Sequence, residues 1–159
     1  MNEWVTIEKA SSATGIEARI IKALVTHKFV PSKFESGNLL VDLQALNEFA
    51  KKANEFIKTL ASIIASRKKI HDYDAIRIAL KEVALRKGFK PFPQACVELG
   101  VRPEVLRRIV KSGKAKTLRF GWNSIFVKVD DELIKLVSEH VRTVPFEEMN
   151  QALEVLMSE

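Results

Sequence analysis

The sequence has little of several residues that mark particular classes of protein. Its 159 residues include one cysteine, Cys96, which has no partner for an internal disulfide, and this excludes the cysteine framework of small secreted domains. Only six glycines are present, and no Gly-rich phosphate loop or dinucleotide fingerprint occurs. The most apolar stretch, LASIIAS between Lys58 and Arg67, is far shorter than the roughly 20 residues needed to cross a bilayer. The start, MNEWVTIEKA, lacks the basic and apolar runs of a signal peptide, so we expect a cytoplasmic protein without a membrane partner.

Residues that support catalysis or metal binding are also scarce. The three histidines, His27, His71 and His140, are far apart, with no Cys or carboxylate at ligand spacing. Cys96 has no nearby His to activate it as a nucleophile, and no Ser, His and Asp order of a hydrolase is present. We therefore expect no catalytic residue, no metal site and no cofactor, and a protein that is not an enzyme.

The sequence is rich in positive charge and has enough apolar residues for a core. It contains 26 Lys and Arg against 20 Asp and Glu, a formal net charge of +6, and 47% of its residues are hydrophobic. A basic balance of this size favours a polyanionic partner, chiefly nucleic acid or an acidic membrane surface.

Residues 92–128 predict two short helices at a tight turn, followed by a hairpin. The segment from Phe92 to Leu99 is amphipathic, Gly100 supplies the positive φ that ends a helix, and Pro103 suits the first turn of the next helix, which we expect to reach about Ser112. KTLRFGWNSIFVKV then alternates side chains around a Gly-Trp-Asn turn, which is typical of two paired strands. Helix, turn, helix and hairpin in this order predict a winged helix-turn-helix.

The same pattern occurs near the N-terminus, which indicates an internal repeat. Gly15 matches Gly100, and the small residues Ser11 and Cys96 occupy the place where two steeply crossing helices nearly touch. The other matched positions are apolar in both copies: Ala10 and Ala95, Ile16 and Val101, Ile21 and Leu106, Leu24 and Ile109. After each hairpin, Asp42 or Asp130 is placed to cap a further helix.

The remaining segments predict helices that pack within one chain or between two. Apolar residues spaced by three and four from Leu46 to Ile63 predict one long amphipathic helix, and Asp72 or Asp74 is expected to cap a second. A third follows from about Pro145. The predicted fold is mainly α with small β-hairpin wings, with tandem winged helix-turn-helix modules at residues 1–50 and 89–142, a helical linker at 51–88 and a C-terminal helix at 143–159. A homo-oligomer through the central and C-terminal helices is one expected arrangement.

Residues 92–137 resemble the DNA-binding domain shared by phage excisionases and MerR-type regulators. The likeness lies in the order of a short helix, a Gly turn, a basic second helix, SGK, a basic wing and an Asp-capped helix, and residues 5–49 resemble a weaker version. The resemblance implies that the second helix enters the major groove of DNA. A single Cys does not fit the multi-thiolate metal sensors among MerR-type regulators. Small terminase subunits of tailed phages also join such a module to oligomerising helices.

For the second module, the expected DNA-binding residues fall into two groups. Residues on the outward face of the second helix are expected to reach base edges or phosphates, with Arg107 and Arg108 as the base readers: Arg102, Glu104, Arg107, Arg108 and Lys111. Residues of the wing are expected to neutralise flanking phosphates: Lys114, Lys116, Arg119 and Lys128. Trp122 and Asn123 at the wing tip either touch the minor groove or, for the Trp, cover the module's own core.

The first module offers a weaker set of candidates. The matching DNA-binding positions are Arg19, Lys22, Thr26, His27 and Lys33. Glu17 and Glu35 offset much of that charge, so this module is expected to bind DNA weakly or to be a partner-binding or structural copy.

Three classes of function remain open from the sequence. The leading one is sequence-specific binding of double-stranded DNA, as a transcription regulator or accessory factor of bacterial, plasmid or phage type. The second is an oligomeric DNA-packaging, assembly or protein-interaction module, similar to a small terminase subunit. The third is an RNA-binding adaptor.

Overall fold

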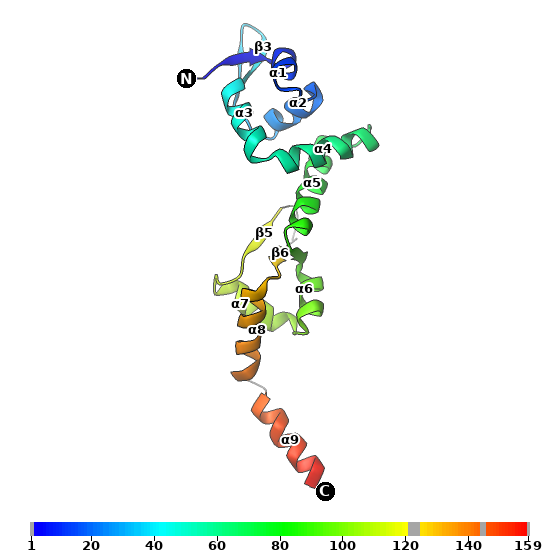
Figure 1. Ribbon diagram of the computed structural model, residues 1–159, viewed down its shortest axis with the longest axis vertical. Helices are drawn as coiled ribbons and strands as arrows, with labels where there is room; N and C mark the ends of the chain where they lie inside the picture. The colour runs from blue at the N-terminus through cyan, green and yellow to red at the C-terminus, as the bar shows by residue number, and fades with distance from the viewer. Residues whose placement is uncertain (1, 121–124, 144–145, 159) are drawn as a thin grey trace. The chain divides into compact units, whose positions relative to one another are not determined.

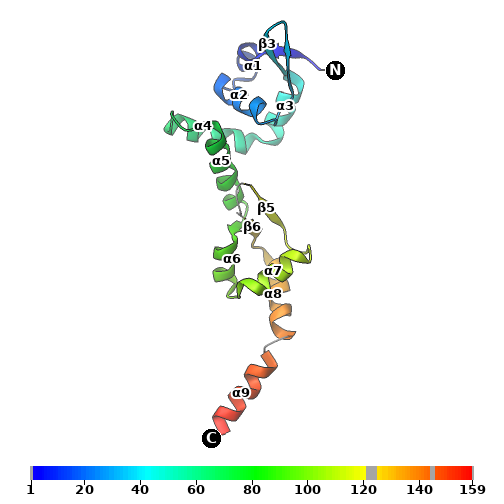
Figure 2. The same ribbon diagram turned by 180° about the vertical axis from the view of Figure 1, so that it is seen from behind.

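The chain divides into two compact units. The structure is a computed structural model that describes residues 2–120, 125–143 and 146–158, together with all their side chains except those of 141–143, 146 and 147 (Figures 1 and 2). Unit 1 comprises residues 1–83 and unit 2 residues 84–159. Both are mainly helical, and each holds one small antiparallel sheet of three strands.

Unit 1 places a three-stranded sheet beside two short helices and then adds three longer ones. Its elements are β1 (Trp4–Thr6), α1 (Ile7–Thr14), α2 (Ala18–Thr26), β2 (Ser32–Glu35), β3 (Asn38–Asp42), α3 (Leu43–Lys52), α4 (Asn54–Ser66) and most of α5 (Asp72–Arg86). The sheet order is β1-β3-β2, with Val5 opposite Val41 and Glu35 opposite Asn38. Ser36 and Gly37 both have positive φ, as a two-residue hairpin turn requires.

Unit 2 repeats this plan, and its first two helices have the same lengths as the first two of unit 1. Its elements are the end of α5, β4 (Phe89–Pro91), α6 (Phe92–Leu99), α7 (Pro103–Lys111), β5 (Thr117–Arg119), β6 (Ile125–Lys128), α8 (Asp131–Thr143) and α9 (Phe146–Ser158). The sheet order is β4-β6-β5. The bounds of α1 and α2 recur 85 residues later in α6 and α7, from Ile7 to Phe92 and from Ala18 to Pro103.

The matched positions of the two units also agree in burial and in local geometry. Ala10 and Ala95 are both fully buried, and so are Ile21 and Leu106. Gly15 and Gly100 adopt left-handed φ values of 77° and 67° at the ends of α1 and α6. Asp42 Oδ1 accepts from the Ala45 amide at 3.2 Å. Asp130 Oδ1 accepts from the Leu133 amide at 2.9 Å, so both predicted N-caps are confirmed.

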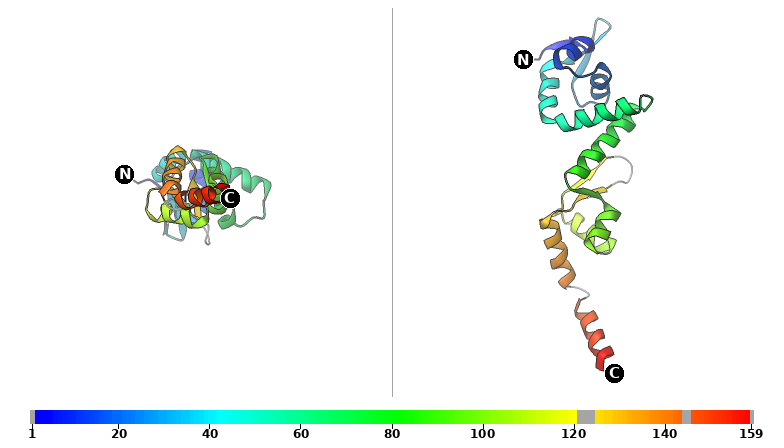
Figure 3. Two further views of the ribbon diagram at one scale, coloured as in Figure 1. Left: turned by 90° about the horizontal axis from the view of Figure 1, so that it is seen from below. Right: turned by 45° about the vertical axis from the view of Figure 1, so that its right-hand side comes forward.

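The expectation of one long central helix is wrong. The chain bends at Ala53, whose backbone (φ −114°, ψ 34°) ends α3 and begins α4, and the right-hand view of Figure 3 shows the bend. The bend allows α4 to turn back and pack against α2. Phe56, Leu60 and Ile63 of α4 join the core of unit 1, so the segment expected to link two modules is part of the first unit's interior.

The expectation of two-stranded hairpins is incomplete. Each hairpin carries a third strand, β1 or β4, which pairs with its second strand and leads directly into the first helix of the unit. Thr6 at the end of β1 also caps α1, because its Oγ1 accepts from the Lys9 amide at 3.2 Å.

Candidate nucleic-acid interface

The candidate interface is built on α7 of unit 2, whose direction depends on the turn before it. Gly100 ends α6 in the left-handed region, and its neighbour Val101 donates its amide to the Cys96 carbonyl at 3.0 Å. Arg102 is extended (φ −73°, ψ 149°) as the N-cap of α7, and Pro103 occupies the first helical position. The second helix therefore starts in a new direction without a break in the surrounding core.

The two faces of α7 differ sharply in chemistry. Leu106 and Ile109 are buried in the core of unit 2, and Val105 and Val110 are half-buried against it. The predicted reading residues are all exposed, on the opposite face and at the helix start: Arg102, Glu104, Arg107, Arg108 and Lys111. The structure thus brings the predicted residues of this helix onto one solvent-facing surface.

The cations of this surface keep their hydrogen-bond donors free. In residues 2–120, 125–143 and 146–158, no ion pair or side-chain hydrogen bond engages Arg102, Arg107, Arg108 or Lys111. The Arg107 guanidinium lies 5.8 Å from the centre of the Phe92 ring, a cation–π contact that positions the side chain without using its N–H groups. An anion can therefore bind these guanidinium and ammonium groups without displacing an ion pair or a side-chain hydrogen bond within the described residues.

A shallow hollow joins the end of α7 to the segment after it. Its volume is about 310 Å³, and Arg108 and Lys114 both line it, together with Ser112 and with Leu136 and His140 of α8. Glu139 lines the same hollow and lowers its positive potential on the α8 side. Arg108 and Lys114 are therefore close neighbours on one surface.

The remaining wing candidates are only partly described. Lys114, Lys116 and Arg119 are exposed, whereas Lys128 on β6 is half-buried. The Lys128 amide donates to the Lys116 carbonyl at 2.9 Å, which ties the base of β5 to β6. Trp122 and Asn123 lie outside the described residues.

Cys96 behaves as a small core residue. It is 6% exposed, and burial raises the pKa of its thiol, an effect that the nearby Arg107 guanidinium opposes and the Glu104 carboxylate reinforces. The thiol is therefore protonated at neutral pH. At the matching position the Ser11 hydroxyl donates to the Ile16 carbonyl at 2.6 Å, so both residues fill the tight crossing between two helices.

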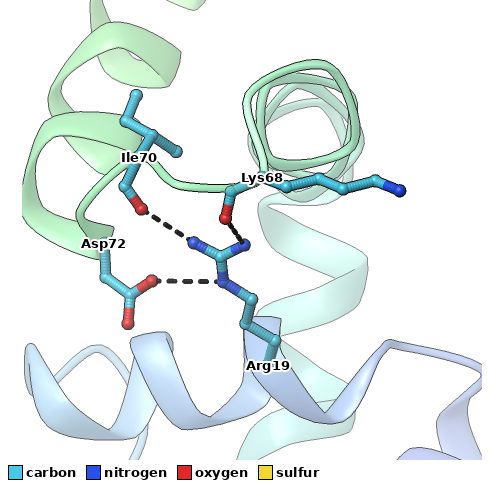
Figure 4. A network of polar contacts seen from close by, with 4 residues as sticks. All are labelled: Arg19, Lys68, Ile70 and Asp72. Atoms are coloured by element: carbon cyan, nitrogen blue, oxygen red, sulfur yellow. Dashed lines mark hydrogen bonds and ion pairs between the residues drawn. The ribbon is translucent and has the colours of Figure 1, made fainter.

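In unit 1, Arg19 lies on the part of α2 that matches the predicted reading surface, and its side chain is bound by other residues of the unit. The Arg19 guanidinium donates to the Lys68 and Ile70 carbonyls, both at 2.8 Å, and its Nε lies 3.6 Å from Asp72 Oδ1 (Figure 4). Three partners from the loop between α4 and α5 and from the first residue of α5 thus occupy the guanidinium. The sequence analysis did not predict this role, in which Nε and both terminal nitrogens of Arg19 have partners within unit 1.

Two of the other candidates of unit 1, His27 and Lys33, also contact side chains of the same unit. The His27 ring contacts the Tyr73 ring at 6.2 Å between centres. Lys33 Nζ pairs with Glu35 Oε2 at 3.1 Å and lies 4.7 Å from the centre of the Trp4 ring. Lys22 and Thr26 remain exposed on α2.

The second helices of the two units differ in residue type at one matched position, and this position also differs in burial. Ala23 of α2 is fully buried in the core that also contains Phe56 and Leu60 of α4. The matching residue of α7 is Arg108, which is exposed. A methyl group at this position lets a further helix pack on α2, whereas a guanidinium keeps the same face of α7 in solvent.

The surfaces expected for oligomerisation also differ from one another. The apolar stripe of α3 and α4 is turned into the core of unit 1, where Leu46 and Leu60 are fully buried. By contrast, α9 exposes large apolar side chains, among them Met149, Leu153 and Leu156.

Two further properties of the described part of the chain concern membrane spans and metal sites. None of its helices has the length and apolar character needed to cross a membrane. It also contains no cluster of three or more His, Cys, Asp or Glu side chains suited to hold a metal ion.

Compared with known proteins, the chain matches no family model, no curated protein and no solved structure.

Proposed function

We propose that unit 2 binds double-stranded DNA as a winged helix-turn-helix and reads its sequence, in the manner of a transcription regulator or an accessory DNA-binding factor. The observation that carries this proposal is the exposed face of α7, where Arg102, Arg107, Arg108 and Lys111 form no ion pair or side-chain hydrogen bond within the described chain. An α-helix with its side chains is about 10–12 Å across, so α7 fits into the major groove, which is about 12 Å wide.

In this proposal Arg107 and Arg108 read bases. Both project from the middle of α7, where a guanidinium can donate two hydrogen bonds to O6 and N7 of guanine. Glu104, one turn earlier, is placed to accept from the N4 amino group of cytosine. The cation–π contact with Phe92 gives Arg107 a defined direction before DNA arrives, which lowers the entropy lost on binding.

The basic residues outside α7 hold the phosphate backbone. Lys114, Lys116 and Arg119 follow α7 in the chain and are exposed, so they are suited to contact phosphates that flank the reading helix. These contacts add affinity without sequence information, and they make binding fall with salt because each one releases condensed counterions.

Unit 1 serves a structural role in this proposal. Its helix α2 has the same sequence pattern as α7. However, carbonyls of the loop between α4 and α5 accept hydrogen bonds from Arg19, and α4 packs against α2. We therefore assign DNA binding to unit 2 alone.

The test begins with selection of fragments bound by the full chain from a random duplex library. On the selected sequence, the double variant Arg107→Ala, Arg108→Ala should lose the preference over random duplex, by roughly 5- to 150-fold for each lost bidentate contact. Lys114→Ala should weaken selected and random duplex alike and lower the salt slope by about 1.

Equal losses on both kinds of DNA from both variants would contradict the division of roles. Binding without any salt slope would contradict DNA binding itself. Duplex RNA of the selected sequence serves as a control, because the deep, narrow major groove of A-form RNA does not admit a reading helix.

An assembly function is the second candidate, and the exposed apolar side chains of α9 favour it. A protein whose main role is assembly should form a defined oligomer and bind random duplex with little salt dependence.

A further inference from the structure

The C-terminal helix α9 carries an apolar stripe that nothing in the described chain covers. Met149, Leu153 and Leu156 follow one another at spacings of four and three, which places them on one face, and Met157 extends that face. Between 56% and 78% of each of these side chains is exposed. Four large apolar side chains at this exposure on one short helix mark an interaction surface.

The internal repeat shows what this kind of helix does when it is covered. Both α4 and α9 have 13 residues and follow the Asp-capped helix of their unit, α3 or α8. With Leu60 aligned to Leu153, three further apolar positions agree: Phe56 with Met149, Ile63 with Leu156, and Ile64 with Met157, whereas the buried Ile57 aligns with Asn150. In α4 all of these residues are buried in the core of unit 1, and α4 packs on α2.

The place that α4 occupies in unit 1 is closed to α9 in unit 2. Ala23 of α2 is fully buried in the core to which α4 contributes Phe56 and Leu60, and α4 packs on α2. Unit 2 has Arg108 at that position, and covering it with an apolar helix would bury an unpaired guanidinium, which costs several kcal/mol. The place that α4 takes in unit 1 is therefore unfavourable for α9, and a partner from outside the chain offers another way to cover the stripe.

The heptad spacing of the stripe and the uncharged positions beside it favour a second copy of the same helix as that partner. The positions beside the stripe hold Asn150 and Ala152, which carry no charge. Glu148 and Glu154 lie at least 100° around the helix from Leu153 at 100° per residue, so two α9 helices meet along their stripes without opposing carboxylates. With Phe146, the sequence also keeps the three-and-four spacing of a coiled-coil seam over two heptads.

We infer that two copies of the chain associate through the Met149, Leu153 and Leu156 stripes of their α9 helices. A 13-residue helix is about 20 Å long, so the contact is smaller than a standard protein–protein interface and the dimer should be weak, with a dissociation constant in the micromolar range. This inference does not depend on the proposed function. If both hold, the dimer presents two α7 helices to two half-sites of DNA.

The test is the mass of the full chain in solution, measured by sedimentation over about 1 to 300 μM, a range that brackets micromolar dissociation constants. The wild-type chain should move from a monomer of 18.0 kDa to twice that mass as concentration rises. Leu153→Glu places a charge in the seam and should remain monomeric throughout, whereas Leu153→Met should dimerise like the wild type.

Val155→Glu is the matched control. Val155 is 60% exposed against 56% for Leu153, but it lies on the opposite side of α9. It introduces the same charge at similar exposure, so it should leave the dimer intact, and circular dichroism of both variants should show unchanged helix content.

A wild-type chain that stays monomeric at about 300 μM, far above a micromolar dissociation constant, would overturn the inference. So would dimers of Leu153→Glu, loss of dimers in Val155→Glu, or an assembly of three or more copies. The proposed function has a separate readout: monomeric Leu153→Glu should keep its preference for the selected half-site while losing affinity for a pair of half-sites about 34 Å apart. If neither the wild type nor the variant prefers the selected sequence, the proposal that the protein reads DNA is wrong, but the inferred dimer is unaffected.

Discussion

Arg19 lies on a helix whose sequence pattern matches that of α7, but its side chain is bound by other residues of the protein. In the sequence it is a cation on the outward face of a predicted reading helix. In the structure its two hydrogen bonds to the carbonyls of Lys68 and Ile70 close the loop between α4 and α5. Its partners are 49 and 51 residues away in the chain. No local pattern carries that information, because helical spacing reports which face is polar but not what covers it.

Replacing Arg19 should therefore affect stability rather than DNA binding. Arg19→Ala leaves two loop carbonyls without their donors, and we expect a loss of about 1–2 kcal/mol in the free energy of unfolding. The Asp72 pair adds little to this figure, since both side chains are more than one-third exposed. Urea unfolding of the full chain measures the loss, and hydrogen exchange should accelerate at the amides of residues 68–75.

Lys22→Ala is the control for this experiment. Lys22 is exposed on the same helix, and its removal should change stability by less than about 0.5 kcal/mol. Equal stability of the two variants would show that the Arg19 contacts contribute nothing to the fold.

At the scale of the element, the two glycine turns set the direction of the second helices. The sequence predicted them correctly, because a residue with positive φ between two amphipathic segments is nearly always Gly. A Cβ added at Gly100 would meet nothing within 4 Å. The demand for Gly is therefore conformational and does not arise from crowding.

Gly100→Ala should destabilise unit 2 by about 1–2 kcal/mol, the cost of holding an L-residue in the left-handed region. Gly100→Asn should cost less, since Asn adopts this region several-fold more often than most residues. Thermal unfolding of the full chain compares the two. Equal losses from Ala and Asn would show that the strain does not come from φ and that the turn is held for another reason.

The strands β1 and β4 and the bend at Ala53 could not be predicted from the sequence. The strands β1 and β4 have three residues each, too few for alternation to show, and they are defined only by pairing with β3 and β6. The bend at Ala53 involves neither Gly nor Pro, and the apolar spacing continues through it. Packing of α4 on α2 decides that bend, and packing across the chain cannot be read from helical periodicity alone.

At the scale of the whole molecule, the two units share a plan and differ in how their charge is distributed. Residues 102–130 contain eight Lys or Arg and two acidic residues, whereas the matching residues 17–42 contain four Lys or Arg and three acidic residues. The sequence therefore indicated which unit would be the more basic. It did not indicate that α4 would pack on α2, and that packing is the reason why we propose different roles for the two units.

The division of roles predicts opposite results at two matched positions. Lys22 of α2 and Arg107 of α7 occupy the same place in the repeat, and both are exposed. If unit 2 alone reads DNA, Arg107→Ala should lower affinity for the selected sequence by about 1–3 kcal/mol, and Lys22→Ala should leave both affinity and salt slope unchanged. Fluorescence anisotropy with a labelled duplex, titrated at several salt concentrations, measures both quantities. Each of the two variants removes one exposed cation from the chain, so a purely nonspecific attraction to DNA predicts the same loss of affinity for both. Equal losses would therefore show that DNA binding depends on the net charge of the chain and not on α7.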